Sequence, residues 1–189
     1  MATRILVAYG TGEGQTARVA QEIAKRLQLR GHLTNLVDLQ VETPDLAEFD
    51  GAALGGSVHG GKFQQELRRY TKTNVASLNN MPTWFFGISL SEAGKHAPID
   101  PDNAAHQIEA FFKETGWIPR EHISLAGALK YRDYNFFKRG LMEQLAGKAG
   151  EDTDTSRNWE YTNWAQVDEF ADGISDAIAK AEALKLLTR

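Results

Sequence analysis

Short apolar runs of β-strand type alternate with stretches of helical spacing along most of this chain. The runs that predict strands are 4–9, 33–39, 50–58, 82–90 and 122–129. The stretches that predict helices are 15–30, 63–78, 103–116 and 163–187. Such alternation is typical of βαβ units, in which right-handed crossovers place helices on both faces of a parallel sheet. The sequence therefore predicts an α/β fold with an open, doubly wound, five-stranded sheet in three layers.

The length and composition fit one globular domain. The chain has 189 residues, of which 42% are hydrophobic and 24% are charged, and these values lie near the average for folded domains. Only the stretch between the last predicted strand and the last predicted helix falls outside the alternation. We expect a single domain over residues 1–189 with an inserted segment at about 130–162.

Composition disfavours several classes of site and location. The chain has no cysteine, which excludes disulfides, iron–sulfur clusters and a cysteine nucleophile. Its five histidines show no paired ligand spacing, so no metal is expected, and the net charge of −4 argues against nucleic acid as a partner. No apolar run approaches the roughly 20 residues that span a bilayer. The opening residues contain no signal-peptide cleavage site, so we expect a cytoplasmic protein.

The turn after the first predicted strand is rich in glycine and threonine. It reads YGTGEGQT over residues 9–16, directly before the first predicted helix. The first turn of a helix presents amides without partners and the positive end of the helix dipole, and both favour an anion. Thr11 and Thr16 offer hydroxyl donors, while Gly12 and Gly14 remove bulk beside a ligand. The alternative is a tight turn that binds nothing.

This turn differs from two other kinds of phosphate loop. A Walker A loop needs a lysine before its final Ser or Thr, but position 15 is Gln. The Rossmann spacing G-x-G-x-x-G is absent, although Gly12, Gly14 and Ala17 give a weak G-x-G-x-x-A pattern. The turn has no basic side chain, and Glu13 is acidic. Binding through amides and hydroxyls alone suits a single terminal phosphate monoester.

The pattern T-x-E-G-Q-T over residues 11–16 resembles the phosphate loop of flavodoxins, T/S-x-T-G-x-T. Thr11, Gly14 and Thr16 match it, and Glu13 stands where a threonine is common. The resemblance implies that the anion is the 5′-phosphate of FMN and that the strand order is 2-1-3-4-5. It also implies that the flavin lies over the carboxyl ends of the strands.

In such a fold the flavin ring lies between the loops that follow the third and fourth strands. Those strand ends read LGGSVHGGKF over residues 54–63 and GISLSEAGKH over residues 87–96, and their glycines let the backbone approach a flat ring. His59 is open to three interpretations: a proton donor, a neighbour of the ring, or a solvated loop residue. Trp84 and the pair at 85–86 lie inside a predicted strand and are expected in the core. The residues expected to hold the cofactor are Thr11, Gly12, Glu13, Gly14, Gln15, Thr16, Ser57, Val58, His59, Gly60, Ser89, Leu90, Ser91 and Gly94.

Basic and aromatic residues are interleaved over residues 128–148. Such a surface suits a flat apolar anion, such as a tetrapyrrole that carries propionates, or an anionic membrane surface. The alternative is a helix that packs its aromatic face on the sheet and turns its charges to water. The residues expected to meet substrate or membrane are Lys130, Tyr131, Arg132, Tyr134, Phe137, Lys138 and Arg139.

The chain also resembles the family of flavodoxin-like bacterial protoporphyrinogen IX dehydrogenases, which are menaquinone-dependent. The pieces that carry the resemblance are GEGQT, NNMPTWFF, AGALKYRDY and GEDTDTSRNWEYTNWAQVDEFA. The tail block with Tyr161, Thr162 and Trp164 is more specific than the phosphate loop. The resemblance implies oxidation of protoporphyrinogen IX to protoporphyrin IX in heme biosynthesis, with menaquinone or ubiquinone as electron acceptor and contact with the inner face of the cell membrane.

Three other functions stay open on the sequence. The first is a flavodoxin-type electron carrier without small-molecule turnover. The second is an NAD(P)H-quinone reductase, for which no second nucleotide motif is present. The third is a binding scaffold that has lost its flavin. Electron transfer needs no side-chain acid or base beyond what a flavin carries, so no side chain is assigned as catalytic.

Overall fold

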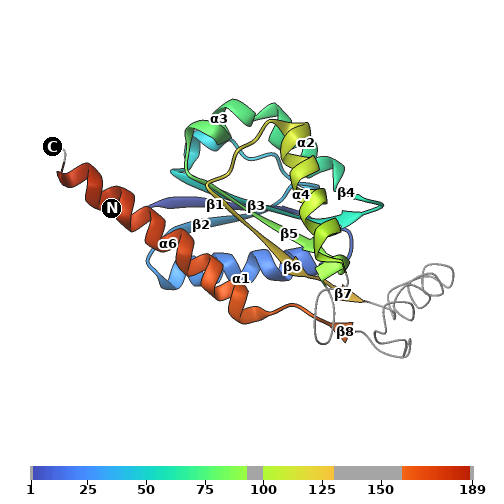
Figure 1. Ribbon diagram of the computed structural model, residues 1–189. Coiled ribbons are helices and arrows are strands. Elements are labelled where there is room, and N and C mark those ends of the chain that lie inside the picture. Colours follow the sequence, from blue (N-terminus) through green and yellow to red (C-terminus); the bar gives the residue numbers. More distant parts are fainter. Residues whose placement is uncertain (1, 93–99, 130–158, 188–189) are drawn as a thin grey trace.

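The computed structural model describes residues 2–92, 100–129 and 159–187, and its elements follow the predicted alternation (Figure 1). The strands are β1 Arg4–Gly10, β2 Leu33–Asp38, β3 Gly51–His59, β4 Lys62–Phe63, β5 Thr83–Ser89, β6 Glu121–Ala126, β7 Ala128–Leu129 and β8 Trp159–Glu160. The helices are α1 Gln15–Leu29, α2 Gln65–Thr73, α3 Val75–Asn80, α4 Pro101–Thr115 and α6 Trp164–Leu187, with 3-10 turns at Leu46–Glu48 and Leu90–Glu92.

The main sheet confirms the predicted strand order. Its order is β2-β1-β3-β5-β6, where β5 and β6 are the fourth and fifth strands expected from the sequence, and these neighbours all pair in parallel. The short strand β4 pairs antiparallel with β3, and β7 pairs with β8 in a separate two-stranded sheet. Because the five strands are parallel, their carboxyl ends meet at one edge, where a ligand site is expected.

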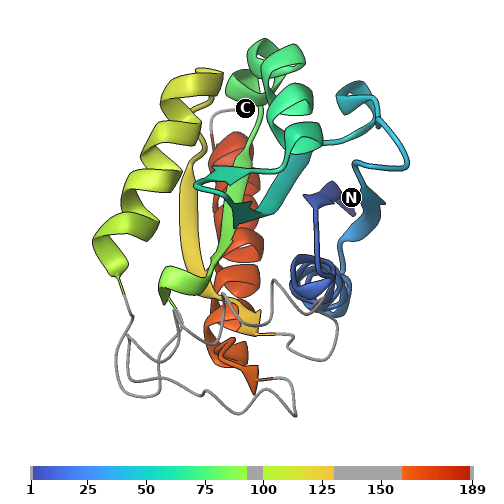
Figure 2. The same ribbon diagram turned by 90° about the vertical axis from the view of Figure 1, so that its right-hand side faces the viewer.

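Helices cover both faces of the sheet and form three layers. In Figures 1 and 2, α1 and α6 lie on one face, and α2, α3 and α4 lie on the other. Each face has its own apolar cluster. Val19, Ile23 and Ile174 belong to the cluster beneath α1 and α6, whereas Leu67 and Phe111 belong to the opposite one.

The aromatic residues of β5 divide between the two clusters. Trp84 and Phe86 face α1 and α6, and Phe85 between them faces the other helices, as the alternation of a strand requires. All three are at most 1% exposed, which confirms their expected place in the core. A strand buried on both faces has a continuous apolar run because neither face meets water.

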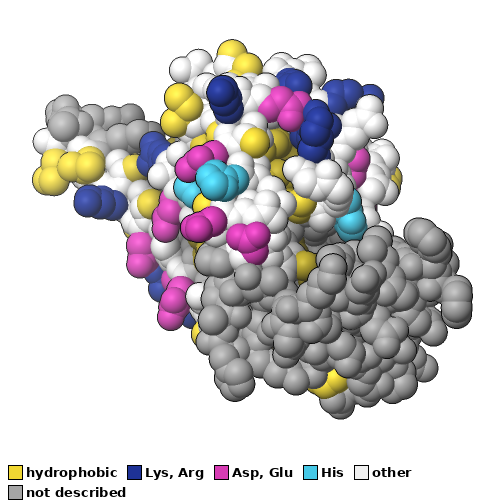
Figure 3. Space-filling view, turned by 45° about the vertical axis from the view of Figure 1, so that its right-hand side comes forward, with side chains coloured by type: hydrophobic (Ala, Val, Ile, Leu, Met, Phe, Trp, Pro, Cys, Tyr) yellow, Lys and Arg dark blue, Asp and Glu magenta, His cyan; other side chains and the backbone are white. Residues whose placement is uncertain are grey.

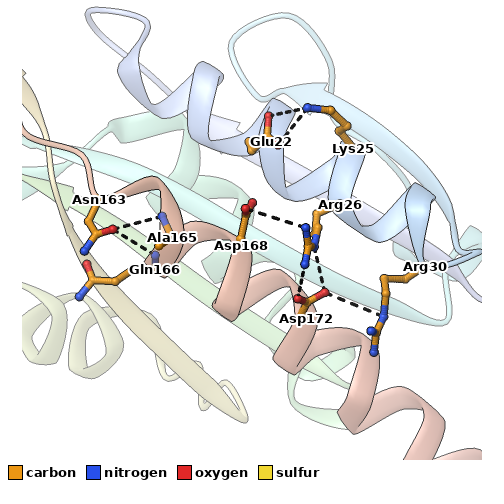
Figure 4. Close-up of polar contacts among 9 residues, drawn as sticks. All are labelled: Glu22, Lys25, Arg26, Arg30, Asn163, Ala165, Gln166, Asp168 and Asp172. Carbon is orange, nitrogen blue, oxygen red and sulfur yellow. Dashed lines mark hydrogen bonds and ion pairs between the residues drawn. The ribbon is translucent and has the colours of Figure 1, made fainter.

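Helices α1 and α6 are also joined by ion pairs along their exposed sides (Figure 4). Arg26 donates from Nε and Nη2 to the two carboxylate oxygens of Asp172, at 3.0 and 2.6 Å. The amino end of α6 is capped by Asn163, whose Oδ1 accepts the backbone N–H of Ala165 at 3.1 Å. The last helix is therefore fixed against the first, and its amino end lies near the start of α1.

Two predicted elements are divided in the structure. The helix expected over 63–78 becomes β4, α2 and α3, because Gly60 and Gly61 adopt positive φ and turn the chain back so that residues 62–63 pair with β3. The strand expected over 122–129 ends at Ala126 and resumes as β7 after Gly127. The breaks at residues 60–61 and at Gly127 lie at the carboxyl edge of the sheet, whereas a further break at Asn74 separates α2 from α3.

The described surface mixes charges of both signs. On the face drawn in Figure 3, acidic and basic side chains are interspersed over the visible elements. In the described parts of the chain, no helix has the length and apolarity that a membrane crossing requires.

Candidate functional site

A pocket lies at the carboxyl edge of the sheet, where four strand ends meet. It brings together the turn after β1, the ends of β3 and β5, and the chain after β6. Its lining residues are Glu13, Gln15, Ser57, Val58, His59, Gly60, Ile88, Leu90, Gly127 and Ala128. Seven of these ten residues were predicted from the sequence to hold the cofactor, so the three separate predicted loops contribute to one pocket.

The turn after β1 exposes an uncapped helix start. Gly14 adopts a left-handed conformation with φ of 82° and precedes α1 without a side-chain cap, and the first turn of the helix carries no acidic residue. The Gly14 amide donates to Thr11 Oγ1 at 2.9 Å, so this amide is already used within the turn. The Thr11 hydroxyl keeps its own proton for donation. The amides of the first turn, beginning at Gln15, remain as donors for an anion.

Thr16 provides the sharpest sign of a missing partner. The residue is fully buried, and its Oγ1 has no hydrogen-bond partner among the described residues. A buried hydroxyl without a partner costs about 1–3 kcal/mol, so such a group calls for a partner from outside the chain, a ligand or an ordered water. Its place in the first turn of α1 fits a phosphate oxygen.

His59 packs on the same turn. A Cβ added to Gly12 would lie 2.8 Å from His59 Nε2, so a larger residue at position 12 would push the His59 ring aside. The His59 ring therefore touches the turn after β1 as well as lining the pocket. This contact joins the first and second predicted loops, although His59 itself is exposed.

The glycines at the end of β3 have a different role from the one expected. A Cβ on Gly55 would lie 2.0 Å from the ring of Phe86, and one on Gly56 would lie 2.5 Å from Leu67 Cδ2. These two glycines make room for core side chains. Beside them, the Ser57 amide donates to Gln64 Oε1 at 2.9 Å, so it is not free to meet a ligand.

The third predicted loop is only partly in the pocket. Leu90 lines it, whereas Ser89 and Ser91 are held by other bonds. Ser89 Oγ accepts the Ser91 amide at 3.1 Å, and Ser91 Oγ accepts Asn103 Nδ2 at 3.0 Å. Gly94 and the predicted substrate or membrane residues Lys130, Tyr131, Arg132, Tyr134, Phe137, Lys138 and Arg139 lie outside the described residues.

Sequence reasoning missed the wall after β6. Gly127 and Ala128 line the pocket, and the Gly127 amide donates to Ser89 O at 3.1 Å. Gly127, a glycine inside the last predicted strand, is the signal that could have identified this wall. Ile88, in β5, also lines the pocket and was treated only as part of a strand.

A segment just before α6 connects two parts of the site. We call residues 159–162 the strap. Gln15 Nε2 donates to Thr162 Oγ1 at 2.9 Å and to Glu160 Oε1 at 3.1 Å. The Tyr161 amide donates to Gly127 O at 3.2 Å. The strap thus ties the start of α1 to the chain that follows β6.

The charge of Glu160 is balanced within this group. Arg18 Nη1 donates to Glu160 Oε2 at 2.8 Å, and the Arg18 guanidinium lies over the Trp164 ring, 5.3 Å from its centroid. Burial alone would raise the pKa of Glu160, but the hydrogen bonds from Arg18 and Gln15 hold it below its ordinary value. The carboxylate is therefore ionised at neutral pH and is paired with a cation.

These donors fit a phosphate monoester joined to a flat ring. The first-turn amides and the hydroxyls of Thr11 and Thr16 are phosphate donors. Val58, Ile88 and Leu90 give the adjoining pocket an apolar wall. Within residues 2–92, 100–129 and 159–187, no group of three or more side chains could hold a metal ion.

Solved structures share this fold. A short-chain flavodoxin associated with a PDU bacterial microcompartment has a TM-score of 0.53 at 15% identity, covering 94% of this chain and 99% of that one. A flavodoxin of Streptococcus pneumoniae TIGR4 has a TM-score of 0.51 at 15% identity, covering 92% and 99%. Rubredoxin oxygen:oxidoreductase from Desulfovibrio gigas has a TM-score of 0.56 at 9% identity, covering 97% of this chain and 37% of that one. At such identities the likeness is one of fold.

Relatives and a family model match most of the chain. A protein of Escherichia coli strain K12 named protoporphyrinogen IX dehydrogenase [quinone] is 27% identical over 173 residues, 91% of this chain and 94% of the relative. A protein of Leishmania major with the same name is 29% identical over 174 residues, 89% of this chain and 73% of the relative. The model of the flavodoxin domain matches residues 6–156. The chain therefore belongs to the flavodoxin domain family, and its cofactor is FMN.

Proposed function

We propose that the protein is an FMN-dependent oxidoreductase that oxidises protoporphyrinogen IX to protoporphyrin IX with a quinone, menaquinone or ubiquinone, as electron acceptor. Two relatives that match most of its length carry the name of this activity. FMN, when bound, takes up electrons from one substrate and gives them to the next. The protein supplies the phosphate donors, the apolar wall and the surface that receives the substrates.

The proposal includes the organisation of the chain. We propose one flavodoxin-like domain over residues 1–189, with an inserted segment at about 130–162 that provides the substrate surface. We propose that the protein works in the cytoplasm. Because these quinones dissolve in membranes, it would contact the inner face of the membrane through that surface. Its basic residues suit both an anionic membrane and the propionates of a porphyrinogen.

The pairing of β7 with β8 is the observation that carries the proposal. Leu129 pairs with Trp159, so the chain leaves for residues 130–158 and returns at one place. Ala128 in β7 lines the pocket, and Gly127 precedes it there. Residues 130–158, which make up most of the inserted segment, are therefore joined at both ends to the β7–β8 pair beside the pocket, where a substrate-binding segment is expected to start.

The pocket itself suits electron transfer to a flat apolar substrate. Its apolar wall includes Val58 and Leu90, from the ends of two strands. Contact between a flat substrate and a flat ring needs such a surface, together with exclusion of water. His59 stands at the pocket beside Gly12 and remains a candidate neighbour of the ring.

An anaerobic assay tests the activity. Purified holoprotein would be mixed with protoporphyrinogen IX and either menaquinone or ubiquinone, and porphyrin fluorescence would be followed. We expect fluorescence to rise only with both protein and quinone present. Controls without protein measure spontaneous oxidation, and an NADH–menadione assay tests the quinone reductase alternative.

Failure of this assay would separate the activity from the cofactor. A protein that holds FMN but forms no porphyrin with either quinone contradicts the proposed oxidation and favours the electron carrier. A protein that neither contains FMN nor binds it in a fluorescence titration would instead favour the scaffold. The FMN measurement and the porphyrin measurement are made on the same sample, so the two outcomes are distinguishable.

A further inference from the structure

We propose that the strap, residues 159–162, is a positioning element of the FMN phosphate site, with Thr162 and Glu160 holding the first turn of α1 in its phosphate-binding geometry. The inference rests on FMN as the cofactor and is independent of the proposed oxidation of porphyrinogen. The strap lies far from this turn in the sequence: Gln15 is 145 residues before Glu160 and 147 residues before Thr162.

The first step concerns the side chain of Gln15. This residue is the first of α1 and only 5% exposed. Its Nε2 has two protons, which go to Thr162 Oγ1 at 2.9 Å and Glu160 Oε1 at 3.1 Å. Its Oε1 accepts Arg18 Nη1 at 3.3 Å. Both ends of the amide are therefore occupied, and the side chain has one arrangement.

The second step connects this amide to the sheet. Thr162 Oγ1 accepts the bond from Gln15 and donates its own proton to Ala126 O at 2.8 Å. Ala126 is the last residue of β6. A continuous chain of hydrogen bonds thus runs from the carboxyl end of β6, in the main sheet, to the first residue of α1. Thr162 lies within this chain and is only 8% exposed.

The third step explains why this matters for phosphate. The amino end of α1 has no side-chain cap, and helix ends without caps fray. The backbone N–H of Gln15 and the hydroxyl of Thr16, which has no partner among the described residues, lie in that first turn. Donors bind an anion more tightly when they are already fixed, because less ordering is needed on binding. The strap supplies the fixation that the missing cap does not.

The fourth step concerns charge. A lone carboxylate near the start of α1 would repel a phosphate. Arg18 pairs with Glu160 at 2.8 Å, so the pair brings no net charge to the site. The strap can therefore support the phosphate turn without weakening the attraction for the anion.

The test compares FMN with riboflavin, which has the same ring and no phosphate. Apoprotein would be titrated with each ligand, and Thr162→Val compared with the wild type. We expect FMN affinity to fall about three- to tenfold, the worth of one ordinary hydrogen bond, while riboflavin affinity stays within about twofold. The ratio of the two affinities isolates the phosphate.

A second variant approaches the same bond from the other side. Gln15→Met keeps the length of the side chain and removes its amide, and we expect the same selective loss of FMN affinity. Because the two variants break one network, the double variant should lose less than the two single losses added together. If Thr162→Val weakens folding, Gln15→Met alone decides the question.

The matched control is a contact between α1 and α6, away from the strap. Asp172→Asn breaks the ion pair between α6 and Arg26, near the far end of α1. It should lower stability and leave the ratio of FMN to riboflavin affinity unchanged. An equal loss for both ligands in Thr162→Val or Gln15→Met, or no loss of FMN affinity, would overturn the positioning role.

Discussion

At the scale of single residues, replacing Thr16 should have opposite effects on the stability of the apoprotein and on its affinity for FMN. Thr16→Val removes a buried hydroxyl that has no partner among the described residues. The apoprotein should become more stable by about 1 kcal/mol, because an unsatisfied polar group leaves the interior. FMN should bind about ten- to a hundredfold more weakly, since a hydrogen bond to a charged group is worth about 1.5–3 kcal/mol. Urea unfolding of the apoprotein and a flavin fluorescence titration measure the two effects.

Thr71 is the matched control for that substitution. It is also fully buried, but its Oγ1 donates to Leu67 O at 2.8 Å. Thr71→Val should lower stability by about 0.5–1 kcal/mol and leave FMN affinity unchanged. If Thr16→Val behaved in this way instead, its hydroxyl would serve the fold and the phosphate would lie elsewhere.

Residue identity alone predicted seven of the ten residues that line the pocket, but not the reasons for their positions. The glycines and threonines of residues 11–16 could be placed because a strand–turn–helix has few local solutions. The glycines at 55 and 56 have the same letters but serve Phe86 and Leu67, as the close approaches show. A glycine in the sequence indicates that another group comes close to the backbone. Whether that group is a ligand or a core side chain depends on the fold.

At the scale of elements, α2 and α4 are joined by a three-membered charge cluster. Glu114 accepts bonds from Arg68 and from Lys72, the latter at 2.7 Å. The hydrogen bond from Arg68 is the largest cause that lowers the pKa of Glu114 to about 2. A carboxyl whose folded pKa is depressed adds stability above its unfolded pKa, here 4.5, and loses it as the pH falls toward 2.

The prediction from this cluster is a pH-dependent difference between two proteins. Glu114→Gln should cost about 0.5–1 kcal/mol of unfolding free energy at pH 7, a modest amount because the cluster is partly exposed. The difference between variant and wild type should shrink as pH falls below about 4.5. Urea unfolding across that range measures it. A difference that stays constant with pH would mean that the loss comes from packing.

Element existence was predictable, and element boundaries were less so. Strands buried on both faces can be predicted because they are continuous apolar runs. The strand predicted over 82–90 differs from β5, Thr83–Ser89, by one residue at each end. The helix expected over 63–78 was wrong at its start, because Phe63 pairs with Val58 in a hairpin. That pairing depends on the turn at Gly60, whose positive φ cannot be foreseen from helical spacing.

At the scale of the whole molecule, the strap shows what a local pattern cannot give. Tyr161, Thr162 and Trp164 were noticed only as part of a family resemblance. The role proposed for Thr162 depends on its contact with Gln15, which is 147 residues away in the chain. No periodicity or spacing encodes such a contact, because it forms only when α6 packs on α1 and returns the strap to the carboxyl edge of the sheet.

The pairing of β7 with β8 predicts that residues 130–158 can be removed without losing the cofactor. Leu129 and Trp159 are direct partners in an antiparallel pair, so a short turn containing Asn-Gly can join them. The strap remains in this variant, and so do the pocket walls. We expect FMN affinity within about twofold of the wild type, and a complete loss of porphyrinogen oxidation in the anaerobic fluorescence assay.

A second variant separates the sequence of that segment from its length. Replacing residues 130–158 with a Gly/Ser linker of equal length keeps the reach of the chain and removes its basic and aromatic side chains. Oxidation should be lost here as well, because these side chains are proposed to receive the porphyrinogen. If the linker variant oxidised porphyrinogen at the wild-type rate, substrate recognition would belong to the pocket and not to the inserted segment. Loss of FMN from either variant would instead show that the segment is part of the cofactor site.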